Sequence, residues 1–425
     1  MSLSSMEWAA GPLPLALLTL QLPFTAILLS RLLSGASRQP PISAPSASAS
    51  DATTGGTTGE AGSVSIIVPT LNEVHRIAPC LQGLIQQGSQ VREILVVDSR
   101  STDGTPAKVS AIAQQDSRIR LITDEPLPPQ WVGRPWALHS GYLASSPKSK
   151  WILGIDADTE PQPDLVAAIL AQAEQQGYDL VSLSPRFRLK SAGEWWLQPA
   201  LLMTLIYRFD SAGVANSAPE RVMANGQCFL CRRALLETLD GYRCAADSFC
   251  DDVSLARVAA AAGFKVGFLD GAKVISVRMY EGLKETWQGW GRSLDLKDAA
   301  SAGQLWGDLA LLMSVQALPL FAVLALLPVA IAGHHSPMLQ LALGLNLFLW
   351  LVRWGMQGAI ATSYHRADDA AGQFLSPAQC FWLSPLADPL AVLRILLSSL
   401  QTRIQWRGRT YQKSQKSTER GPAKH

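Results

Sequence analysis

The sequence is poor in charged side chains and in cysteine, and both shortages exclude classes of protein. Only 16% of its 425 residues are Asp, Glu, Lys or Arg, against about 25% in an average soluble domain. The 36 basic and 34 acidic residues leave a formal net charge of +2, which provides no large basic surface for nucleic acid. Six cysteines in a chain of this length are too few for a disulfide-stapled scaffold. A nucleic-acid-binding protein and a disulfide-rich protein are therefore both excluded.

The missing charge is concentrated in two long runs. No Lys, Arg, Asp or Glu occurs in the 22 residues from Ala9 to Ser30 or in the 44 residues from Leu309 to Val352. About 20 apolar residues cross the hydrocarbon core of a bilayer, so the first run suits one span and the second suits two. With an apolar share of 48%, the chain is neither disordered nor purely soluble, and a membrane protein is predicted.

The N-terminal run is predicted to be a membrane anchor within residues 1–33. A secretory signal peptide is the alternative, but no Lys or Arg precedes the run, and the run exceeds the usual apolar signal core of about 7–15 residues. In residues 34–62, 24 of 29 positions are Gly, Ser, Pro, Ala or Thr. This composition is typical of a flexible linker that buries nothing.

A C-terminal membrane domain is predicted over residues 301–400. Two spans are expected near 309–333 and 338–360, and they return the chain to the side on which it entered. The third apolar segment, 376–400, is interrupted by two prolines and two charged residues, so we expect it to be re-entrant or to lie in the membrane interface. Residues 401–425 carry seven basic residues and one acidic residue, as in a cytoplasmic tail, although a disordered solubilising tail has the same composition.

Residues 63–300 have the pattern of an α/β domain. Apolar runs predict strands at 64–70, 93–99, 119–124 and 151–158, with an amphipathic helix at 77–87 between the first two. Runs that are apolar throughout and separated by helices indicate a parallel sheet covered on both faces. Ligands of such sheets bind beyond the carboxyl ends of the strands.

Two features of this domain leave alternatives open. The apolar segment Trp195–Phe209 is too short to span a bilayer and is either a core helix or an interfacial helix. Cys228, Cys231, Cys244 and Cys250 have a spacing that could bind zinc. Because the first two fall three apart in a predicted strand, they would point to opposite faces, and reduced thiols are favoured.

Polar residues follow the predicted strands and form a candidate nucleotide site. Asp156 and Asp158 come directly after the strand that starts at Trp151, and two such carboxylates can share a divalent cation with phosphate oxygens. Asp98 ends an earlier strand of the same sheet, and Thr70 and Glu73 follow the first strand. Several acids at one edge repel one another unless a cation or donor groups offset their charge, which favours a ligand site over solvated turns.

Three further motifs could contribute to this site. Arg134 in WVGRPWALHSG has a guanidinium suited to diphosphate oxygens, although it could also be a surface residue. Asp251 and Asp252 precede a predicted helix, so one is expected to be its N-cap and the other is available as a general base. In a predicted loop, Trp287, Trp290 and Arg292 could contact a sugar or phosphate, or form part of an interfacial aromatic belt.

Taken together, these motifs resemble those of the family 2 glycosyltransferases, which have the GT-A fold. The resemblance covers roughly residues 64–300 and rests on VPTLNE, VVDSRSTDG, WVGRPWALHSG, IDAD, NGQCFLCRRALLETLDGY and DDVSLA, in the order that the family has them. It implies an α/β catalytic domain with a Rossmann-like mixed sheet that binds a nucleotide-sugar, followed by C-terminal transmembrane helices. The sequence departs from the family at Asp98-Ser99-Arg100-Ser101, where the family has Asp-Asp-Gly-Ser, and at Asp251, where it has Glu.

The segments GRPWALHSG, VRMYEGLKETWQGWGR and WRGRTY are similar to those of the membrane-bound branch that glycosylates isoprenoids. This branch includes the hopene-associated glycosyltransferases and the carotenoid glycosyltransferases that act on the 2'-hydroxyl of myxol. It implies an inverting transfer from a GDP-, UDP- or dTDP-sugar to a membrane isoprenoid, with the catalytic domain on the cytoplasmic side of a plasma or thylakoid membrane.

The resemblance also implies a role for each candidate residue. Asp156 and Asp158 would hold Mg²⁺ or Mn²⁺, and Asp252 would act as the base. The donor would be bound by Thr70, Glu73, Asp98, Arg134 and Asp156, and the acceptor by Asp251, Trp287, Trp290 and Arg292.

Other functions remain open from the sequence alone. The acceptor could be a hopanoid, a glycolipid or a polyprenyl phosphate, and Arg232, Arg233 and Arg257 are candidate phosphate contacts. A processive polysaccharide synthase is less favoured, because two spans and one interrupted segment make a poor channel. A non-catalytic nucleotide- or lipid-binding scaffold is the remaining alternative.

Overall fold

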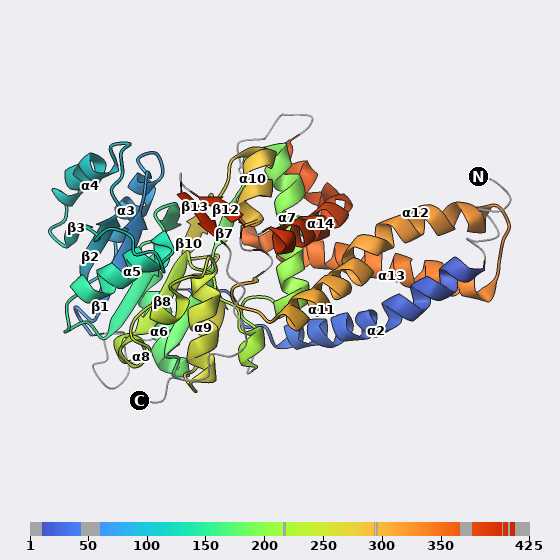
Figure 1. The fold of residues 1–425 in the computed structure, drawn as a ribbon, viewed down its shortest axis with the longest axis horizontal. Helices are drawn as coiled ribbons and strands as arrows, with labels where there is room; N and C mark the ends of the chain where they lie inside the picture. Colours follow the sequence, from blue (N-terminus) through green and yellow to red (C-terminus); the bar gives the residue numbers. More distant parts are fainter. Residues whose placement is uncertain are drawn as a thin grey trace.

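The computed structural model describes residues 11–43, 60–215, 218–292, 294, 296–365, 376–401, 403–406 and 409–412. Its α/β domain is built on a seven-stranded sheet at one end of the molecule, and long helices extend from the other end (Figure 1). The strands of this sheet, in spatial order, are β3 (Ile119–Thr123), β2 (Val91–Asp98), β1 (Val64–Thr70), β4 (Trp151–Ile155), β8 (Cys228–Arg232), β6 (Leu180–Ser184) and β9 (Val266–Asp270).

The sheet is mixed, whereas the apolar runs alone indicated a parallel one. The strand β8 pairs antiparallel with both β4 and β6, and the other neighbouring strands pair in parallel. The six parallel strands therefore end at one edge, and β8 begins there. This arrangement places the residue just before β8 at the same edge as the residues that follow β4.

Helices cover both faces of the sheet, and alternate strand residues face opposite sides. Ile66 and Val68 of β1 pack in one hydrophobic core, while Ile67 packs in the other. Cys228 packs in the first of these cores and Cys231 in the second. Because they lie on opposite faces of the sheet, they cannot belong to one zinc site. The first face is covered by α3 (Ile77–Ile85), α4 (Thr105–Ala113) and α6 (Leu165–Gln176), and the second by α5 (Gly133–Ala144), α8 (Arg233–Thr238) and α9 (Asp251–Ala261).

A smaller sheet connects the catalytic domain to the helices beyond it. Its order is β11 (Tyr364–His365), β7 (Arg186–Arg188), β10 (Ile275–Val277) and β5 (Thr159–Pro161). The helices beside it are α7 (Ala192–Phe209) and α10 (Gly282–Trp290). The segment predicted as a loop around Trp287 is therefore largely the end of α10.

The helix α7 lies between the catalytic domain and the long helices (Figure 1). It begins with a capping box, in which Ser191 accepts a hydrogen bond from Glu194 N and the Glu194 carboxylate accepts one from Lys190 N. Trp195 and Tyr207 are almost fully buried among residues of the C-terminal helices. The sequence left a core helix or an interfacial helix as alternatives for this segment, and in the structure it is a core helix.

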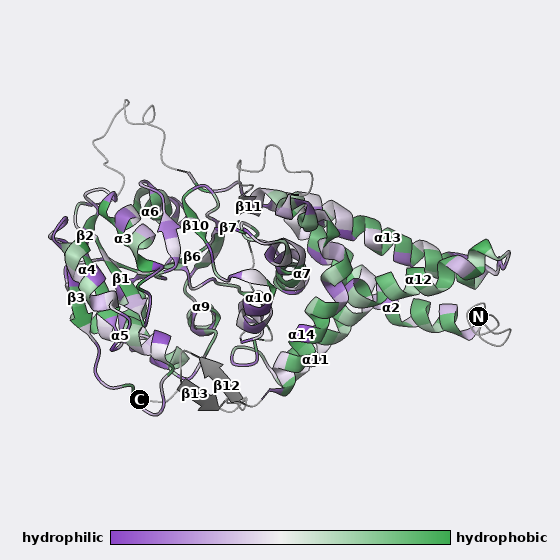
Figure 2. Cartoon of the chain, turned by 90° about the horizontal axis from the view of Figure 1, so that it is seen from above, coloured by the Kyte–Doolittle hydropathy of each residue, from purple (hydrophilic) through white to green (hydrophobic). Residues whose placement is uncertain are grey.

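The described residues contain four helical segments long and apolar enough to cross a membrane: Pro12–Ser34, Ala302–Ile331, Pro337–Ser363 and Pro377–Leu400. The first is α2 (Pro12–Ser34), and the second is formed by α11 (Ala302–Leu312), the π-helical segment η5 (Met313–Ala317) and α12 (Leu318–Ile331). The third is α13 (Pro337–Ile360) with η6 (Ala361–Ser363), and the fourth is η8 (Pro377–Ala387) with α14 (Asp388–Leu400). The helices α2, α12 and α13 lie side by side and are predominantly apolar (Figure 2).

Buried polar contacts join these helices. Gln21 of α2 and Asn346 of α13 exchange two side-chain hydrogen bonds of 2.9 Å, and Gln21 also donates to the Ser314 carbonyl of η5. Arg353 of α13 pairs with Asp388 at the start of α14, with Nε 2.7 Å from a carboxylate oxygen. Because an unpaired polar group is costly in hydrocarbon, these contacts determine which helix faces meet.

Part of the predicted linker 34–62 is folded against the catalytic domain. Ile42 is buried in the first core, and its backbone N–H donates to the carbonyl of Asp270 in β9. Arg38 donates to the Ala212 carbonyl at 2.9 Å and forms an ion pair with Asp270. Residues 35–43 are therefore a docked strap, and composition missed it because one buried isoleucine is enough to anchor a short segment. Residues 44–59 of the predicted linker lie outside the described part of the chain.

The C-terminal tail is only partly described. Residues Arg403–Trp406 and Arg409–Gln412 form an antiparallel hairpin, β12 and β13. The predicted basic tail otherwise lies outside the described residues, as do the first ten residues of the predicted anchor.

Candidate active site

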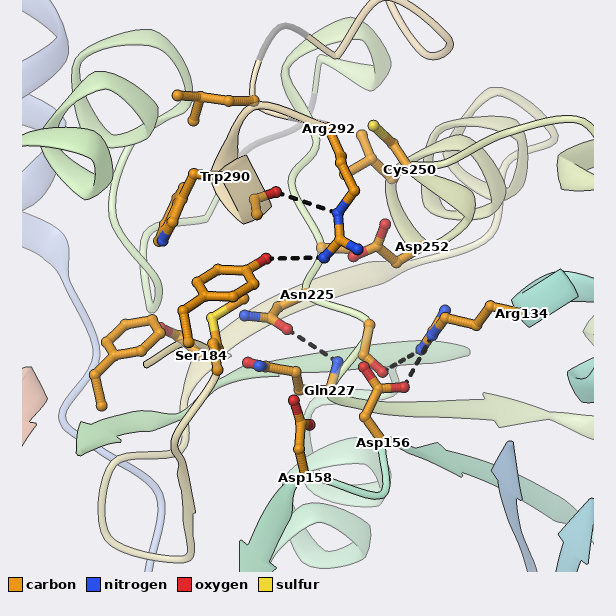
Figure 3. A pocket seen from close by; sticks show the side chains of 18 of the residues that line it. Arg134, Asp156, Asp158, Ser184, Asn225, Gln227, Cys250, Asp252, Trp290 and Arg292 are labelled. Carbon is orange, nitrogen blue, oxygen red and sulfur yellow. Dashed lines mark hydrogen bonds and ion pairs between the residues drawn. The ribbon is translucent and has the colours of Figure 1, made fainter. Parts of the chain in front are cut away.

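A cavity of about 1090 Å³ runs along the edge where the parallel strands end. It is lined at one end by residues that follow β1 and β4 and at the other by residues of α7 and α10. Figure 3 shows Arg134, Asp156, Asp158, Asp252, Trp290 and Arg292 around it. Of the predicted site residues, the cavity lining includes Thr70, Glu73, Arg134, Asp156, Asp158, Asp251, Asp252, Trp290 and Arg292.

The candidate metal ligands are Asp156 and Asp158, in the turn that follows β4. No group of three or more His, Cys, Asp or Glu side chains suited to a metal occurs among the described residues. Gln227, however, lies next to Asp158 (Figure 3), and its buried Oε1 accepts no hydrogen bond from any described group. Two carboxylates and an amide oxygen are the hard donors that Mg²⁺ and Mn²⁺ take, with phosphate oxygens completing the shell. The residues present therefore fit a divalent cation.

Sequence reasoning missed Gln227. The one signal was its position directly before a predicted strand, which does not show which other strand it pairs with. Gln227 immediately precedes the predicted strand CFLCR, and its carbonyl accepts a hydrogen bond of 3.2 Å from Asp156 N. Only the antiparallel pairing of β8 with β4 brings these two segments together. The sequence within either segment does not contain this pairing.

Arg134, at the start of α5, joins the metal pair to the acidic pair. Its Nε donates to Asp156 at 2.9 Å, and its Nη1 forms an ion pair with Asp251. A Cβ on Gly226 would lie only 2.6 Å from Arg134 Nη2, so a glycine at this position lets the guanidinium pass. The carboxylates raise the pKa of Arg134 against the opposing effect of burial. In this structure Arg134 therefore binds carboxylates at the position where the sequence predicted a diphosphate contact.

Asp251 and Asp252 begin α9, but neither is its N-cap. The N-cap position is Cys250, and no side chain caps this helix end. Burial raises the pKa of Asp251 to about 7, even though Arg134 opposes the shift. Burial also raises the pKa of Asp252, against the opposing effects of Arg134 and of the Val253 and Gly226 backbone N–H groups. Since the carboxylate of Asp251 is bound to Arg134, Asp252 is the acid of the pair that remains to face the cavity (Figure 3).

The end of the cavity that was predicted to bind the nucleoside is formed by the loops after β1 and β2. Thr70 and Glu73 line the cavity, but Asp98 does not. The Asp98 carboxylate accepts a hydrogen bond of 2.9 Å from Ser101 N and lies 3.4 Å from the Thr70 hydroxyl. Asp98 therefore lies behind the lining and holds the loop, whereas the sequence predicted a direct contact with the nucleoside.

The departure from the family motif at Arg100 has a conformational consequence. Arg100 has φ +64°, a left-handed conformation that favours glycine. It stands where the family motif has glycine, so a residue with a Cβ here takes a conformation that glycine adopts more readily. Ser99, in place of the second family aspartate, lines the cavity and donates to Asp124 at 2.7 Å.

The opposite end of the cavity is formed by α10 and the residues after it. Trp290 and Arg292 line it, and Arg292 Nη2 donates to the Tyr280 hydroxyl at 3.3 Å (Figure 3). Trp287 is outside the lining and packs against Arg394 of α14, with the guanidinium carbon 5.3 Å from the ring centre. Residues three apart on a helix differ in direction by only about 60°, and the contact with Arg394 holds Trp287 against α14 while Trp290 faces the cavity.

An apolar wall connects this end of the cavity to the candidate membrane helices. Its members on α7 are Leu202, Leu205 and Ile206, and Ile360 contributes from the end of α13. The same cavity is therefore lined both by the carboxylates that follow β4 and by the hydrocarbon side chains of α7 and α13.

The three arginines considered as phosphate contacts lie outside the cavity lining. Arg232 packs over Trp151 and pairs with Asp179. Arg233 donates to the carbonyls of the turn before β4, and Arg257 donates to the carbonyls of Val222 and Ala299. Each guanidinium stabilises the fold, so the argument for a phosphate acceptor loses the residues on which it rested.

The fold and the cavity define a class of protein: an α/β domain with an acidic strand edge, joined to candidate membrane helices. Residues 65–240 match the family model described as Glycosyl transferase family 2. Residues 65–240 are thus similar to this family, in the part of the chain where the motifs predicted the resemblance.

Two curated relatives are similar to more than half of the chain. The chain is 28% identical over 235 residues to a 4,4'-diaponeurosporenoate glycosyltransferase of Staphylococcus haemolyticus, covering 55% of this chain and 61% of that protein. The protein of the same name from Staphylococcus aureus is 24% identical over 234 residues, covering 54% and 60%. The chain thus spans about three fifths of the length of these relatives.

Among solved structures, a mannosyltransferase from Pyrobaculum calidifontis in complex with GDP-Man and Mn²⁺ is similar over most of its length. The match has a TM-score of 0.51 at 18% identity and covers 90% of this chain and 99% of that one. This likeness confirms the GT-A fold class.

Proposed function

We propose that the protein is an inverting glycosyltransferase that transfers a sugar from a nucleotide-sugar to the hydroxyl of a membrane isoprenoid of the carotenoid class. The observation that carries this proposal is the single cavity, with Asp156 and Asp158 at one end and the apolar side chains of α7 and α13 at the other. A hydrocarbon acceptor could stay in the bilayer and extend only its hydroxyl to the donor. The names of the staphylococcal relatives support an acceptor of the carotenoid class.

The donor end would bind a nucleoside diphosphate together with Mg²⁺ or Mn²⁺. Asp156, Asp158 and the Gln227 amide oxygen would hold the cation, which would offset the negative charge that develops on the leaving diphosphate. Thr70 and Glu73 would contact the nucleoside, with Asp98 holding the loop behind them. Arg134 would lie between this end and the acidic pair, where it limits the repulsion among the carboxylates.

Asp252 would act as the general base. Its carboxylate would accept the proton of the acceptor hydroxyl as the oxygen attacks the anomeric carbon from the face opposite the diphosphate. Because this is a single displacement, the configuration at that carbon inverts, and an α-linked donor gives a β-glycoside. The catalytic domain would lie on the cytoplasmic side of a plasma or thylakoid membrane, since nucleotide-sugars are made in the cytosol.

The specific acceptor proposed from the sequence is the 2'-hydroxyl of myxol, and a hopanoid or glycolipid is the second candidate. The apolar wall suits all three, so the choice among them needs a chemical test. A comparison of pigment and lipid extracts from cells with and without the protein, by chromatography and mass spectrometry, provides it. Loss of a carotenoid glycoside with accumulation of the free hydroxy-carotenoid is expected, and the mass difference gives the sugar class. Unchanged pigments with a missing hopanoid glycoside would contradict the carotenoid acceptor.

A further inference from the structure

The inner face of α14 holds the end of α10. The guanidinium of Arg394 packs over the ring of Trp287, and a Cβ on Gly291 would lie only 1.7 Å from Arg394 Nη2. The guanidinium therefore occupies the space that a side chain at position 291 would need. Ser398, one turn further along α14, donates from its hydroxyl to the Gly291 carbonyl. Residues 287–292 are therefore packed tightly against α14, and we call this contact between α14 and α10 the joint.

The joint lies directly beside the cavity. Trp290 and Arg292 flank Gly291 in the sequence, and both line the cavity. At its other end, α10 is held by α7, because Gly282 N donates to the Glu194 carboxylate at 2.6 Å. With both ends of α10 fixed, a shift of α14 would be transmitted to Trp290 and Arg292.

The opposite face of α14 and of the η8 segment before it is apolar and exposed. Leucines recur at intervals of three or four residues, which places them on one side of the helix. No described residue buries them. They are Leu383, Leu386, Leu390, Leu393, Leu397 and Leu400.

Two observations identify what covers this leucine face. Trp382 of η8 stacks on Trp354 of α13, with ring centres 6.4 Å apart, and both rings are exposed. The pair makes the leucine face continuous with a candidate membrane span, and exposed tryptophans are typical of the lipid–water interface. The chain that follows Leu400 carries seven basic residues and one acidic residue, which complements a surface of anionic lipid headgroups.

We propose that the leucine face of α14 binds an anionic lipid surface, and that Arg394 on its inner face is a positioning residue that sets Trp290 and Arg292 in the acceptor half of the cavity. Sugar transfer would then depend on lipid contact at α14, while donor binding at Asp156 and Asp158 would not. This inference rests on the proposed function for its effect on transfer, but the lipid contact can be tested without it.

The lipid contact is tested by labelling with a water-soluble maleimide in native membranes. Leu393→Cys is compared with Leu143→Cys, which lies on the exposed surface of α5 in the catalytic domain, in a chain whose half-buried Cys244 and Cys380 are replaced by serine. We expect Leu393→Cys to react at least about tenfold more slowly, because bilayer burial excludes the reagent. Equal rates would overturn the proposal, whatever reaction the protein catalyses.

The positioning role is tested with the full chain in nanodiscs that contain anionic lipid and a hydroxy-carotenoid. Arg394→Leu removes the cation–π contact with Trp287, so the acceptor KM should rise about tenfold. Binding of UDP and GDP with Mn²⁺ should stay unchanged, and Arg394→Lys, which keeps the cation over Trp287, should restore part of the loss. If donor binding and transfer fall equally, Arg394 only stabilises the structure, and the proposed positioning role is wrong.

The lipid dependence of transfer is tested with a matched pair of charge substitutions. Leu393→Glu should lower transfer, whereas Leu143→Glu should not. If both variants transfer sugar like the wild type, lipid contact does not control the site and the proposal is wrong. If the wild type itself binds nucleotide but transfers no sugar to any isoprenoid, the proposed function fails, and the labelling result still decides the lipid contact.

Discussion

At the scale of single residues, Asp252 is the residue on which the proposed chemistry depends most. Asp252→Asn keeps the size of the side chain but removes the carboxylate that accepts the proton. General-base catalysis contributes about 10²–10⁴-fold, so we expect kcat to fall by that range while nucleotide binding with Mn²⁺ is retained. Transfer rates and nucleotide titration measure the two effects separately.

A matched control for this variant is Asp164→Asn. Asp164 is an exposed aspartate at the start of α6, so it tests the same substitution at a helix start outside the cavity. Its activity should equal that of the wild type. If Asp252→Asn kept more than about half of the wild-type rate, the assignment of Asp252 as base would be wrong.

The acidic pair also predicts how the rate depends on pH. Burial raises the pKa of Asp251 to about 7 and also raises that of Asp252, so the base is protonated over a wider range than an exposed aspartate would be. A protonated carboxyl cannot accept the proton of the acceptor, so activity should fall as the pH is lowered, and it should do so at a higher pH than an aspartate of ordinary pKa would give. A profile of kcat/KM against pH measures this limb, and a midpoint at or below the ordinary aspartate pKa of about 4 would contradict it.

Arg100 predicts a gain in stability. Its left-handed conformation, with φ +64°, costs about 1 kcal/mol or more for a residue with a Cβ. Arg100→Gly should therefore increase the free energy of unfolding of the catalytic domain by up to about 1 kcal/mol, because its 3.8 Å pair with Asp124 is partly exposed and contributes little. Arg100→Ala is the control, since alanine keeps the Cβ and should give no gain in chemical denaturation.

At the scale of elements, the hydrogen-bonded pair of Gln21 in α2 and Asn346 in α13 predicts that loss of either side chain lowers the stability of the protein. Gln21→Leu leaves Asn346 buried without its exchanged hydrogen bonds, which should cost about 1–2 kcal/mol. Thermal unfolding in detergent measures this loss, and Thr19→Leu on the exposed side of α2 is the control. The double variant Gln21→Leu, Asn346→Leu should lose less stability than the sum of the two single losses. If the loss in the double variant equals that sum, the two side chains are not directly coupled.

The elements show how far the sequence leads. The strand β1 and the start of α3 were predicted residue for residue, because an uninterrupted apolar run and an amphipathic pattern are local signals. The family motifs predicted the GT-A fold class, and this is confirmed. The antiparallel insertion of β8, which brings Gln227 to Asp156, depends on pairing between distant segments and has no local signature.

The acceptor end was predicted less well for the same reason. Which of Trp287 and Trp290 faces the cavity depends on the rotation of α10, and that rotation is fixed by Glu194 and Arg394, which are distant in the sequence. The docking of residues 35–43 was missed because their composition matches that of the unstructured stretch predicted around them.

At the scale of the whole molecule, the position of the cavity predicts how the acceptor reaches it. Because α7 and α13 form its apolar wall, a hydrophobic acceptor should enter from the bilayer in which the protein resides. The transfer rate should then follow the mole fraction of acceptor within that bilayer, and not its total concentration. Diluting proteoliposomes in buffer at constant lipid composition should leave the rate per enzyme unchanged, and a proportional fall would contradict entry from the bilayer.

The strap formed by residues 35–43 has a consequence for biosynthesis. The helix α2 leaves the ribosome before the α/β domain, yet Ile42 binds the backbone of Asp270 in the last strand of the main sheet. The strap therefore has no docking site until almost the whole catalytic domain has been translated. During that interval α2 can already be in the bilayer, tethering the nascent domain beside the membrane while its sheet is completed.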